Sequence, residues 1–292
     1  MKKICFLLMA LFSTLTAFPD SFPSIANQDI DLSTGRLAYR DEGQGEVLLC
    51  LHAVGHSSKD FQSLYDRLPL ERYRIIAVDF PSHGRSAKAP SPISATFFQS
   101  ITQEFIERMA LDRITIIGNS IGGATGLRIA AESDKVRALV LSNPGGLDKG
   151  GLLAPIFLNR KIAFFKKGRD QKPRFQKAFE NYYRQVWPAE AASARRVEIT
   201  ADAYALAPGL VEAWESFKRK EEDLRPLIEQ VKVPVLFAWC MKDKAIRFGR
   251  NAKAIGAFAQ AEVVKYKGAG HTPYVECPAA FVRDFEAFME RL

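Results

Sequence analysis

Short apolar runs that alternate with helical patterns constrain the fold of this chain more than any other feature. Six runs of five to eight residues, rich in aliphatic side chains, are typical of strands buried on both faces. This alternation predicts an α/β protein with a mostly parallel sheet and helices on both of its faces. The predicted strands span residues 47–52, 74–79, 114–118, 136–142, 233–240 and 262–266, and the helical segments span 57–68, 95–109, 121–132, 247–258 and 278–292.

The pattern changes before this alternating region and again within it. Two short runs at residues 29–32 and 36–40 predict an N-terminal hairpin. Between about residues 147 and 230 no strand pattern is found, whereas aromatic residues recur at helical spacing. We therefore expect a core formed by residues 27–146 and 231–292, with a helical lid insertion at residues 147–230 over the carboxyl-terminal edge of the sheet.

Composition and charge exclude several classes of protein. Hydrophobic residues make up 47% of the chain and charged residues 25%, which excludes a disordered chain and a multispan membrane protein. The formal charge of +8 favours anionic ligands or surfaces. The chain has no zinc-finger spacing and no RNA-binding or basic-zipper signature, so we expect no nucleic-acid partner.

The N-terminus has the pattern of a secretory signal peptide. Lys2 and Lys3 precede a mostly apolar run at residues 4–15, and small residues follow up to Ala17. This run is too short to span a bilayer, which needs about 20 residues. We expect residues 1–17 to be a signal peptide and the mature protein to be secreted or periplasmic. The alternative is an apolar N-terminal helix packed on the body of the protein.

The mature chain would keep three cysteines. Cys50 and Cys240 lie in strand-like runs, where buried free thiols are common. At most one disulfide can form among Cys50, Cys240 and Cys277. In an oxidising compartment Cys240 and Cys277 are the conceivable pair, and the sequence alone does not decide this.

A basic segment lies in the expected lid. Residues 160–177 contain eight Lys or Arg against one Asp. One interpretation is a solvated helix face. The other is contact with an anionic membrane, as a peripheral partner, or with an acidic substrate.

One pentapeptide has the spacing of an activated serine on a sharp turn. Gly118-Asn119-Ser120-Ile121-Gly122 matches the pattern G-x-S-x-G and lies between a strand-like run and a helical segment. Such a turn strains the backbone of Ser120 and lifts its hydroxyl off the sheet, while the glycines avoid crowding. We expect Ser120 to be a nucleophile. The alternative is a glycine-rich turn that only allows close packing.

A serine nucleophile needs a base, and the base needs an acid that orients it. His271 follows the last predicted strand, where loops of a parallel sheet meet ligands, so we expect it to be the general base. Asp243 follows the preceding strand at the same edge and is the expected acid. The rival position after residue 142 holds Asn143, an amide that cannot stabilise an imidazolium as a carboxylate does.

Attack on a carbonyl also requires backbone N–H groups that stabilise the negative charge on its oxygen. We expect one from Ile121, and the other from Val54, with Ala53 as the less favoured alternative. His52 and His56 lie in the same loop without a third ligand nearby, so we expect no metal there and a structural role for His52.

Together these motifs resemble the α/β-hydrolase superfamily, in particular its lidded esterase, perhydrolase and carbon–carbon-bond hydrolase branch. The resemblance covers residues 36–146 and 231–292, and Ala53 stands where members usually have glycine. The order of serine, aspartate and histidine along the chain is that of the family. The matching segments are LHAVG at 51–55, DFPSHGRS at 79–86, GNSIGG at 118–123, the loop of Asp243, and GAGHTPYVECP at 268–278.

The resemblance implies a serine hydrolase that cleaves a small-molecule carboxylic ester through an acyl-enzyme. Such a carboxylesterase or lipase-like enzyme needs no cofactor and no metal. Ser120 argues against the dehalogenase and epoxide-hydrolase relatives, which use an aspartate nucleophile. Two alternatives stay open, namely a carbon–carbon bond hydrolase that acts on dienone-type acids with the same residues, and a non-enzymatic ligand receptor on the same fold.

Overall fold

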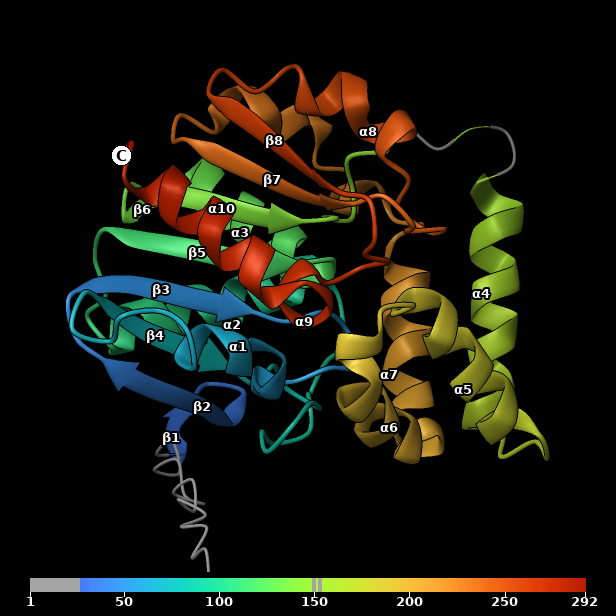
Figure 1. Ribbon diagram of the computed structural model, residues 1–292. Coiled ribbons are helices and arrows are strands. Elements are labelled where there is room, and N and C mark those ends of the chain that lie inside the picture. Colours follow the sequence, from blue (N-terminus) through green and yellow to red (C-terminus); the bar gives the residue numbers. More distant parts are fainter. Residues whose placement is uncertain (1–26, 149–150, 152–153) are drawn as a thin grey trace, which may run out of the picture.

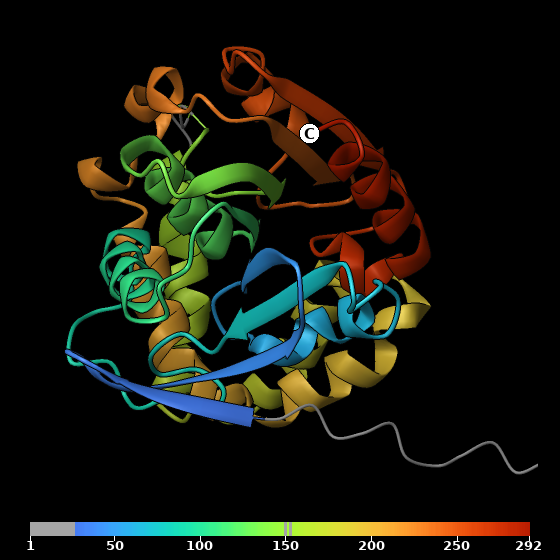
Figure 2. The same cartoon turned by 90° about the vertical axis from the view of Figure 1, so that its left-hand side faces the viewer.

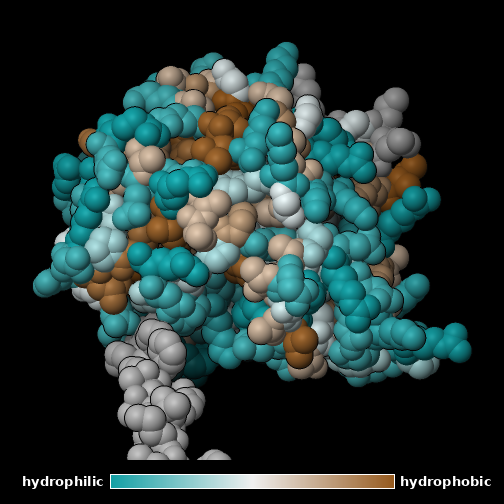
Figure 3. Space-filling view, viewed as in Figure 1, coloured by the Kyte–Doolittle hydropathy of each residue, from teal (hydrophilic) through white to brown (hydrophobic). Residues whose placement is uncertain are grey.

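The computed structural model describes residues 27–148, 151 and 154–292 (Figure 1). The predicted signal peptide at residues 1–17 lies outside the described residues, so export stays a prediction. None of the described helices is both long enough and apolar enough to cross a bilayer. The face seen in Figure 1 is mostly hydrophilic, and its apolar side chains lie in separate groups (Figure 3).

A single mostly parallel sheet forms the centre of the molecule. Its strands are β1 (Asn27–Leu32), β2 (Gly35–Gly43), β3 (Glu46–Leu51), β4 (Tyr73–Val78), β5 (Ile114–Asn119), β6 (Val136–Ser142), β7 (Val235–Cys240) and β8 (Ala261–Tyr266). Their order in the sheet is β1-β2-β4-β3-β5-β6-β7-β8. The β1–β2 hairpin and the β2–β4 pair are antiparallel, and the other pairs are parallel. The predicted α/β fold class is therefore confirmed.

Helices cover both faces of this sheet (Figures 1 and 2). One face carries α2 (Ala95–Arg108), α3 (Ile121–Glu132) and α8 (Phe248–Ile255), and the other carries α1 (Gln62–Tyr65), α9 (Pro273–Glu276) and α10 (Pro278–Met289). Residues of β3 alternate between the two cores, with Leu49 and Leu51 in one and Leu48 and Cys50 in the other. A strand buried on both faces must be continuously apolar, which explains the run in the sequence.

One predicted helix is not a continuous α-helix in the structure. The segment at residues 57–68 forms a 3-10 turn, η1 (Ser58–Phe61), followed by the single turn of α1. The Ser58 N–H donates to the Asp79 carboxylate at 2.7 Å, so the start of this segment is attached to the loop that follows β4.

Four helices lie at the carboxyl-terminal edge of the sheet, in the stretch for which the sequence predicts a lid (Figure 1). They are α4 (Ala154–Arg169), α5 (Phe175–Val186), α6 (Ser193–Ala201) and α7 (Ala203–Ser216). Short 3-10 turns accompany them, namely η2 (Glu190–Ala192), η3 (Lys220–Glu222) and η4 (Arg225–Gln230). The four helices have a hydrophobic core of their own, in which Phe165, Phe179 and Trp187 are fully buried.

A buried ion pair attaches these helices to the core. Arg195 on α6 donates to Asp60 Oδ1 and to Ser57 Oγ, each at 2.9 Å. The other carboxylate oxygen of Asp60 lies 2.6 Å from His56 Nδ1. Burial alone would raise the pKa of Asp60, but the facing His56 and Arg195 lower it to about 2. The carboxylate is therefore ionised and holds α6 against the loop that follows β3.

Cys50, Cys240 and Cys277 are free thiols. The pairing of Cys240 with Cys277 that the sequence leaves open is therefore not formed. Burial raises the pKa of Cys277 to about 12, so this half-buried thiol stays protonated near neutral pH.

Candidate active site

Ser120 occupies a strained turn between β5 and α3. Its φ of 54° and ψ of −114° lie in a region that L-residues rarely adopt. The flanking glycines explain how the chain makes this turn. A Cβ added to Gly118 would press on the backbone of Gly122, and a Cβ added to Gly122 would overlap the carbonyl oxygens of Leu51 and His52. The start of α3 thus packs directly on the loop after β3.

Asp243 and His271 form a hydrogen-bonded pair at the same edge of the sheet. Asp243 Oδ2 lies 2.6 Å from His271 Nδ1. Asp243 Oδ1 accepts the backbone N–H groups of Ala245 at 2.7 Å and Ile246 at 2.9 Å, which fixes the carboxylate. Burial lowers the pKa of His271, but the charge and hydrogen bond of Asp243 outweigh it, so the net shift is upward.

Asn143, at the rival position for the acid, supports Asp243 instead. Its side-chain amide is fully buried and donates to Asp243 Oδ2 at 3.0 Å. The side-chain oxygen of Asn143, Oδ1, accepts the Cys240 N–H at 2.8 Å, which connects the end of β6 to the end of β7. Sequence reasoning rejected Asn143 as the acid because it is an amide, and so missed this supporting contact. The available signal was that Asn143 and Asp243 follow two predicted strands that end at the same edge of the sheet.

Glu276 fixes the backbone of the histidine loop. Its carboxylate accepts the N–H groups of Gly270, His271 and Thr272 at distances of 2.8 to 3.0 Å. Burial raises the pKa of Glu276, and the backbone hydrogen bonds partly offset this shift. Sequence reasoning missed this residue. The available signal was a single acidic residue between the apolar residues Val275 and Cys277, which is unusual for a solvated surface turn.

A second chain of hydrogen bonds connects the nucleophile turn, the histidine loop and the lid. Asn119, next to Ser120, donates to the His271 carbonyl at 2.9 Å and accepts from Thr272 Oγ1 at 3.0 Å. The Trp187 indole N–H in turn donates to Thr272 Oγ1 at 3.0 Å. The position of His271 is therefore tied both to the turn of Ser120 and to the end of α5.

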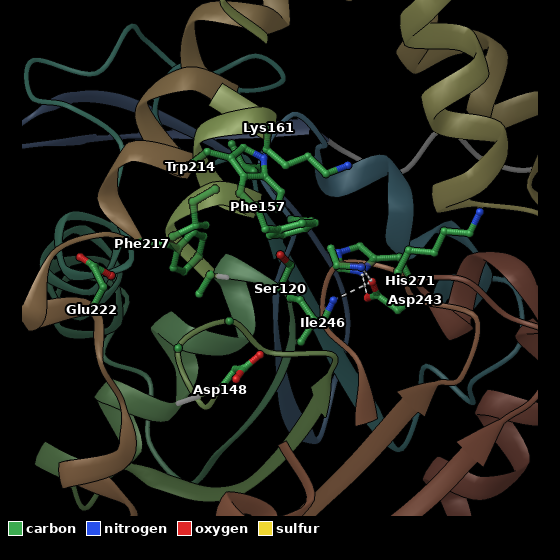
Figure 4. Close-up of a pocket in the computed structure, with 18 of the residues that line it drawn as sticks. Ser120, Asp148, Phe157, Lys161, Trp214, Phe217, Glu222, Asp243, Ile246 and His271 are labelled. Carbon is green, nitrogen blue, oxygen red and sulfur yellow. Dashed lines mark hydrogen bonds and ion pairs between the residues drawn. The ribbon is translucent and has the colours of Figure 1, made fainter. Parts of the chain in front are cut away.

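These elements enclose a cavity of about 430 Å³ between the sheet edge and the lid. Ser120, Asp243 and His271 all line it, and Figure 4 shows them facing one space. Ser120 Oγ makes no hydrogen bond with any group in the described part of the chain, His271 included, so the expected contact between nucleophile and base is not formed in this structure. The helical segment at residues 154–217 contributes aromatic walls to the cavity, from Phe157, Tyr182, Trp214 and Phe217.

The two expected oxyanion donors lie near Ser120. Ile121 is the first residue of α3, so its N–H has no partner within the helix. Val54 lines the cavity next to Ala53. The positive φ of this loop, 78°, falls on Gly55 and not on Ala53, so the backbone at Ala53 does not require the glycine that the family resemblance leads one to expect there.

The histidines of the neighbouring loops have structural contacts. His52 Nδ1 lies 2.7 Å from the Ala53 carbonyl, and His52 Nε2 accepts the Phe80 N–H at 3.0 Å. His83 Nδ1 lies 3.0 Å from the Pro81 carbonyl. Ser86 Oγ accepts the N–H of Ala38 at 2.8 Å. Within the described ranges, no group of three His, Cys, Asp or Glu side chains is placed to hold a metal ion.

Comparisons with known proteins agree with this fold. A family model described as "Alpha/beta hydrolase family" matches residues 48–284. Lipase 3 of Moraxella sp. is 25% identical over 276 residues, which cover 87% of this chain and 81% of that protein. The 2-hydroxy-6-oxo-6-phenylhexa-2,4-dienoate hydrolase of Burkholderia cepacia is 23% identical over 260 residues, 86% of this chain and 90% of that protein. Among solved structures, an esterase from Exiguobacterium antarcticum is similar with a TM-score of 0.78 and 19% identity, covering 91% of this chain and all of that one.

Proposed function

The chain belongs to the alpha/beta hydrolase family, and from this premise we propose that it is a serine hydrolase that cleaves carboxylic esters through an acyl-enzyme. The observation that carries the proposal is the cavity that Ser120, Asp243 and His271 line together, with the last two hydrogen-bonded at 2.6 Å. Similarity to a lipase and to an esterase supports the ester class. The substrate is then a small-molecule ester, and these side chains perform the reaction without a cofactor.

In the proposed acylation, the Ser120 hydroxyl rotates toward His271 and its oxygen attacks the ester carbonyl carbon. His271 Nε2 accepts the proton, while Asp243 holds Nδ1 and stabilises the imidazolium. The N–H groups of Val54 and Ile121 donate to the carbonyl oxygen as it becomes an oxyanion. When the tetrahedral intermediate collapses, His271 returns the proton to the departing alkoxide, and the alcohol leaves.

Deacylation uses the same groups in the same roles. A water molecule attacks the carbonyl carbon of the acyl-enzyme, and His271 accepts one of its protons. The second tetrahedral intermediate is stabilised by the same two N–H groups. Its collapse breaks the bond to Ser120 Oγ, and His271 gives the proton back to this oxygen. The products are the carboxylic acid and the free enzyme.

The proposal is tested with p-nitrophenyl esters from acetate to palmitate. Ser120→Ala should lower kcat on the best of these esters by about 10⁴- to 10⁶-fold, because no nucleophile remains. Ser100→Ala is the matched control, because Ser100 is an exposed residue of α2 that does not line the cavity. Unchanged turnover in Ser120→Ala would contradict the proposal. A protein that binds esters but hydrolyses none would instead support the ligand receptor.

A carbon–carbon bond hydrolase is the second candidate, because the dienoate hydrolase of Burkholderia cepacia aligns over 86% of this chain. In this candidate the same Ser120, Asp243 and His271 would act on a dienone-type acid. Parallel assays with a dienone acid and with the p-nitrophenyl esters separate the two reactions. Good turnover of esters with none of the dienone acid would exclude the second candidate, and the reverse would exclude the first.

A further inference from the structure

The basic segment at residues 160–177 divides into two kinds of cation. Lys166 pairs with Glu215 at 3.0 Å and Arg169 pairs with Asp170 at 2.9 Å, both at the surface. Lys161 is different, because it is half-buried and lines the cavity that contains Ser120. Figure 4 shows its side chain beside Phe157 and Trp214, on one side of Ser120. The sequence signal is the four-residue spacing of Phe157 and Lys161, which places both on one face of α4.

Aromatic rings, and no carboxylate, surround the ammonium group of Lys161. Its Nζ lies 4.3 Å from the ring centroid of Tyr182, 5.8 Å from that of Phe157 and 6.0 Å from that of Trp214. No Asp or Glu of the described chain lies within ion-pair distance of this nitrogen. Burial lowers the pKa of Lys161, and Asp243 partly offsets this shift. Cation–π contacts compensate only part of the lost hydration of an ammonium group.

The neighbouring charges do not neutralise Lys161. Asp243, the acid that acts on it electrostatically, already accepts four hydrogen bonds, from Asn143, Ala245, Ile246 and His271. Lys244, which also lines the cavity, is a second cation, and its Nζ donates to Gln185 Oε1 at 3.1 Å. The cavity therefore has a positive region next to the Asp243–His271 pair.

The arginines that line the cavity differ from Lys161 in having acidic partners. Arg225 pairs with Asp223 at 2.5 Å. Arg250 pairs with Asp148 at 2.7 Å, and Arg219 pairs with Glu221 at 3.6 Å. These cations are already compensated, so they leave less positive charge for a ligand than Lys161 does.

We propose that Lys161 is an anion subsite of this cavity, and that the natural substrate is an ester carrying a carboxylate. The proposal rests on the proposed ester hydrolysis and names the substrate class of the same site. The carboxylate would pair with Lys161 Nζ, while Phe157 and Trp214 contact the apolar chain between the carboxylate and the ester carbonyl. A lysine binds an anion as a point charge, and one such charge balances the single negative charge of a carboxylate.

Matched pairs of substrates test this subsite and decide which side of the ester carries the charge. For the acyl side, monomethyl adipate is compared with methyl hexanoate, which replaces the carboxylate by a methyl group. For the alcohol side, 5-(butanoyloxy)pentanoate is compared with pentyl butanoate. Wild type should prefer the charged member of one pair by about tenfold in kcat/KM, since one such ion pair contributes on the order of 1.4 kcal/mol. The pair that shows this preference identifies the side.

Variants of Lys161 then assign the preference to one side chain. Lys161→Met should raise KM for the charged ester by about tenfold and change kcat/KM of the neutral partner by less than about twofold. Lys161→Arg should keep the preference, because it keeps the charge. Lys167→Met is the control, since Lys167 is exposed on the same helix and does not line the cavity.

Two results would overturn the subsite. One is a wild-type enzyme with no preference for either charged ester. The other is equal loss on charged and neutral esters in Lys161→Met, which would indicate a structural role. Calorimetric binding of adipate to Ser120→Ala, with and without Lys161→Met, tests the subsite without turnover. Failure of the ester hydrolysis and failure of the subsite are therefore distinguishable.

Discussion

The side-chain amide of Asn143 donates at 3.0 Å to Asp243 Oδ2, the same carboxylate oxygen that lies 2.6 Å from His271 Nδ1. Asn143 follows β6 and Asp243 follows β7, so the parallel pairing of these strands brings the two side chains together. This hydrogen bond fixes the position of the Asp243 carboxylate oxygen that faces the imidazole.

Replacing this donor by a carboxylate should impair the site. In Asn143→Asp a second negative charge would lie near Asp243, and the hydrogen bond that supports Asp243 would be lost. A lost hydrogen bond to a charged group costs about 2 kcal/mol, so kcat should fall by roughly 30-fold. Asn181→Asp, on the exposed surface of α5, is the control. An Asn143→Asp enzyme with wild-type kcat would show that Asn143 does not support the pair.

The pH dependence should report the environment of His271. The pKa of His271 is raised because the contribution of Asp243 outweighs the lowering by burial. A general base works only when neutral, so kcat/KM should fall as the pH drops through this raised pKa. The acidic limb should therefore lie above about 6.5, the ordinary value for histidine.

Asp243→Asn is the matching variant for this pH profile. It should move the acidic limb of kcat/KM to lower pH and also reduce the plateau, since the amide no longer stabilises the imidazolium. The profile is measured in buffers of constant ionic strength. Identical limbs in wild type and Asp243→Asn would assign the titration to another group.

Glu276 should act on catalysis through the position of the His271 loop. Glu276→Gln keeps the size of the side chain, but its NH₂ group would face backbone donors that now meet a carboxylate oxygen. We expect kcat to fall by about tenfold with little change in KM, because the loop positions the base and does not bind substrate.

A pH profile separates positioning from a general loss of stability in this variant. The charge of Glu276 contributes to the raised pKa of His271. The acidic limb of Glu276→Gln should therefore move to lower pH. Glu290→Gln, an exposed residue after α10, should behave as wild type in both measurements. Unchanged kcat and an unchanged limb would limit Glu276 to a role in folding.

The exposed cations of the basic segment are the side chains that we expect to contact an anionic membrane. They are Arg160, Lys167, Arg169, Lys172, Arg174 and Lys177. Association with phosphatidylserine vesicles in a sedimentation assay should weaken as the salt concentration rises. It should weaken further when Lys167, Lys172 and Lys177 are all changed to glutamine. No association at low salt would leave the segment as a solvated helix face.

The sequence predicts the sheet well because strands buried on both faces must be continuously apolar. It also predicts that Ser120, Asp243 and His271 lie together, because each follows a strand at the same edge. The supporting contacts are harder to predict. Asn143 supports Asp243 across a gap of 100 residues, and this depends on which strands become neighbours in the sheet. The inward direction of Lys161 depends on how α4 packs against α7, which a count of charges does not reveal.

Covalent labelling of the serine tests the central claim most directly. A fluorophosphonate reacts only with an activated hydroxyl, and mass spectrometry of the digested protein locates the adduct. We predict one adduct, on Ser120, that is absent in Ser120→Ala and strongly slowed in His271→Ala, because the attack requires the base. An unlabelled protein, or an adduct on a different residue with Ser120 unmodified, would contradict the account.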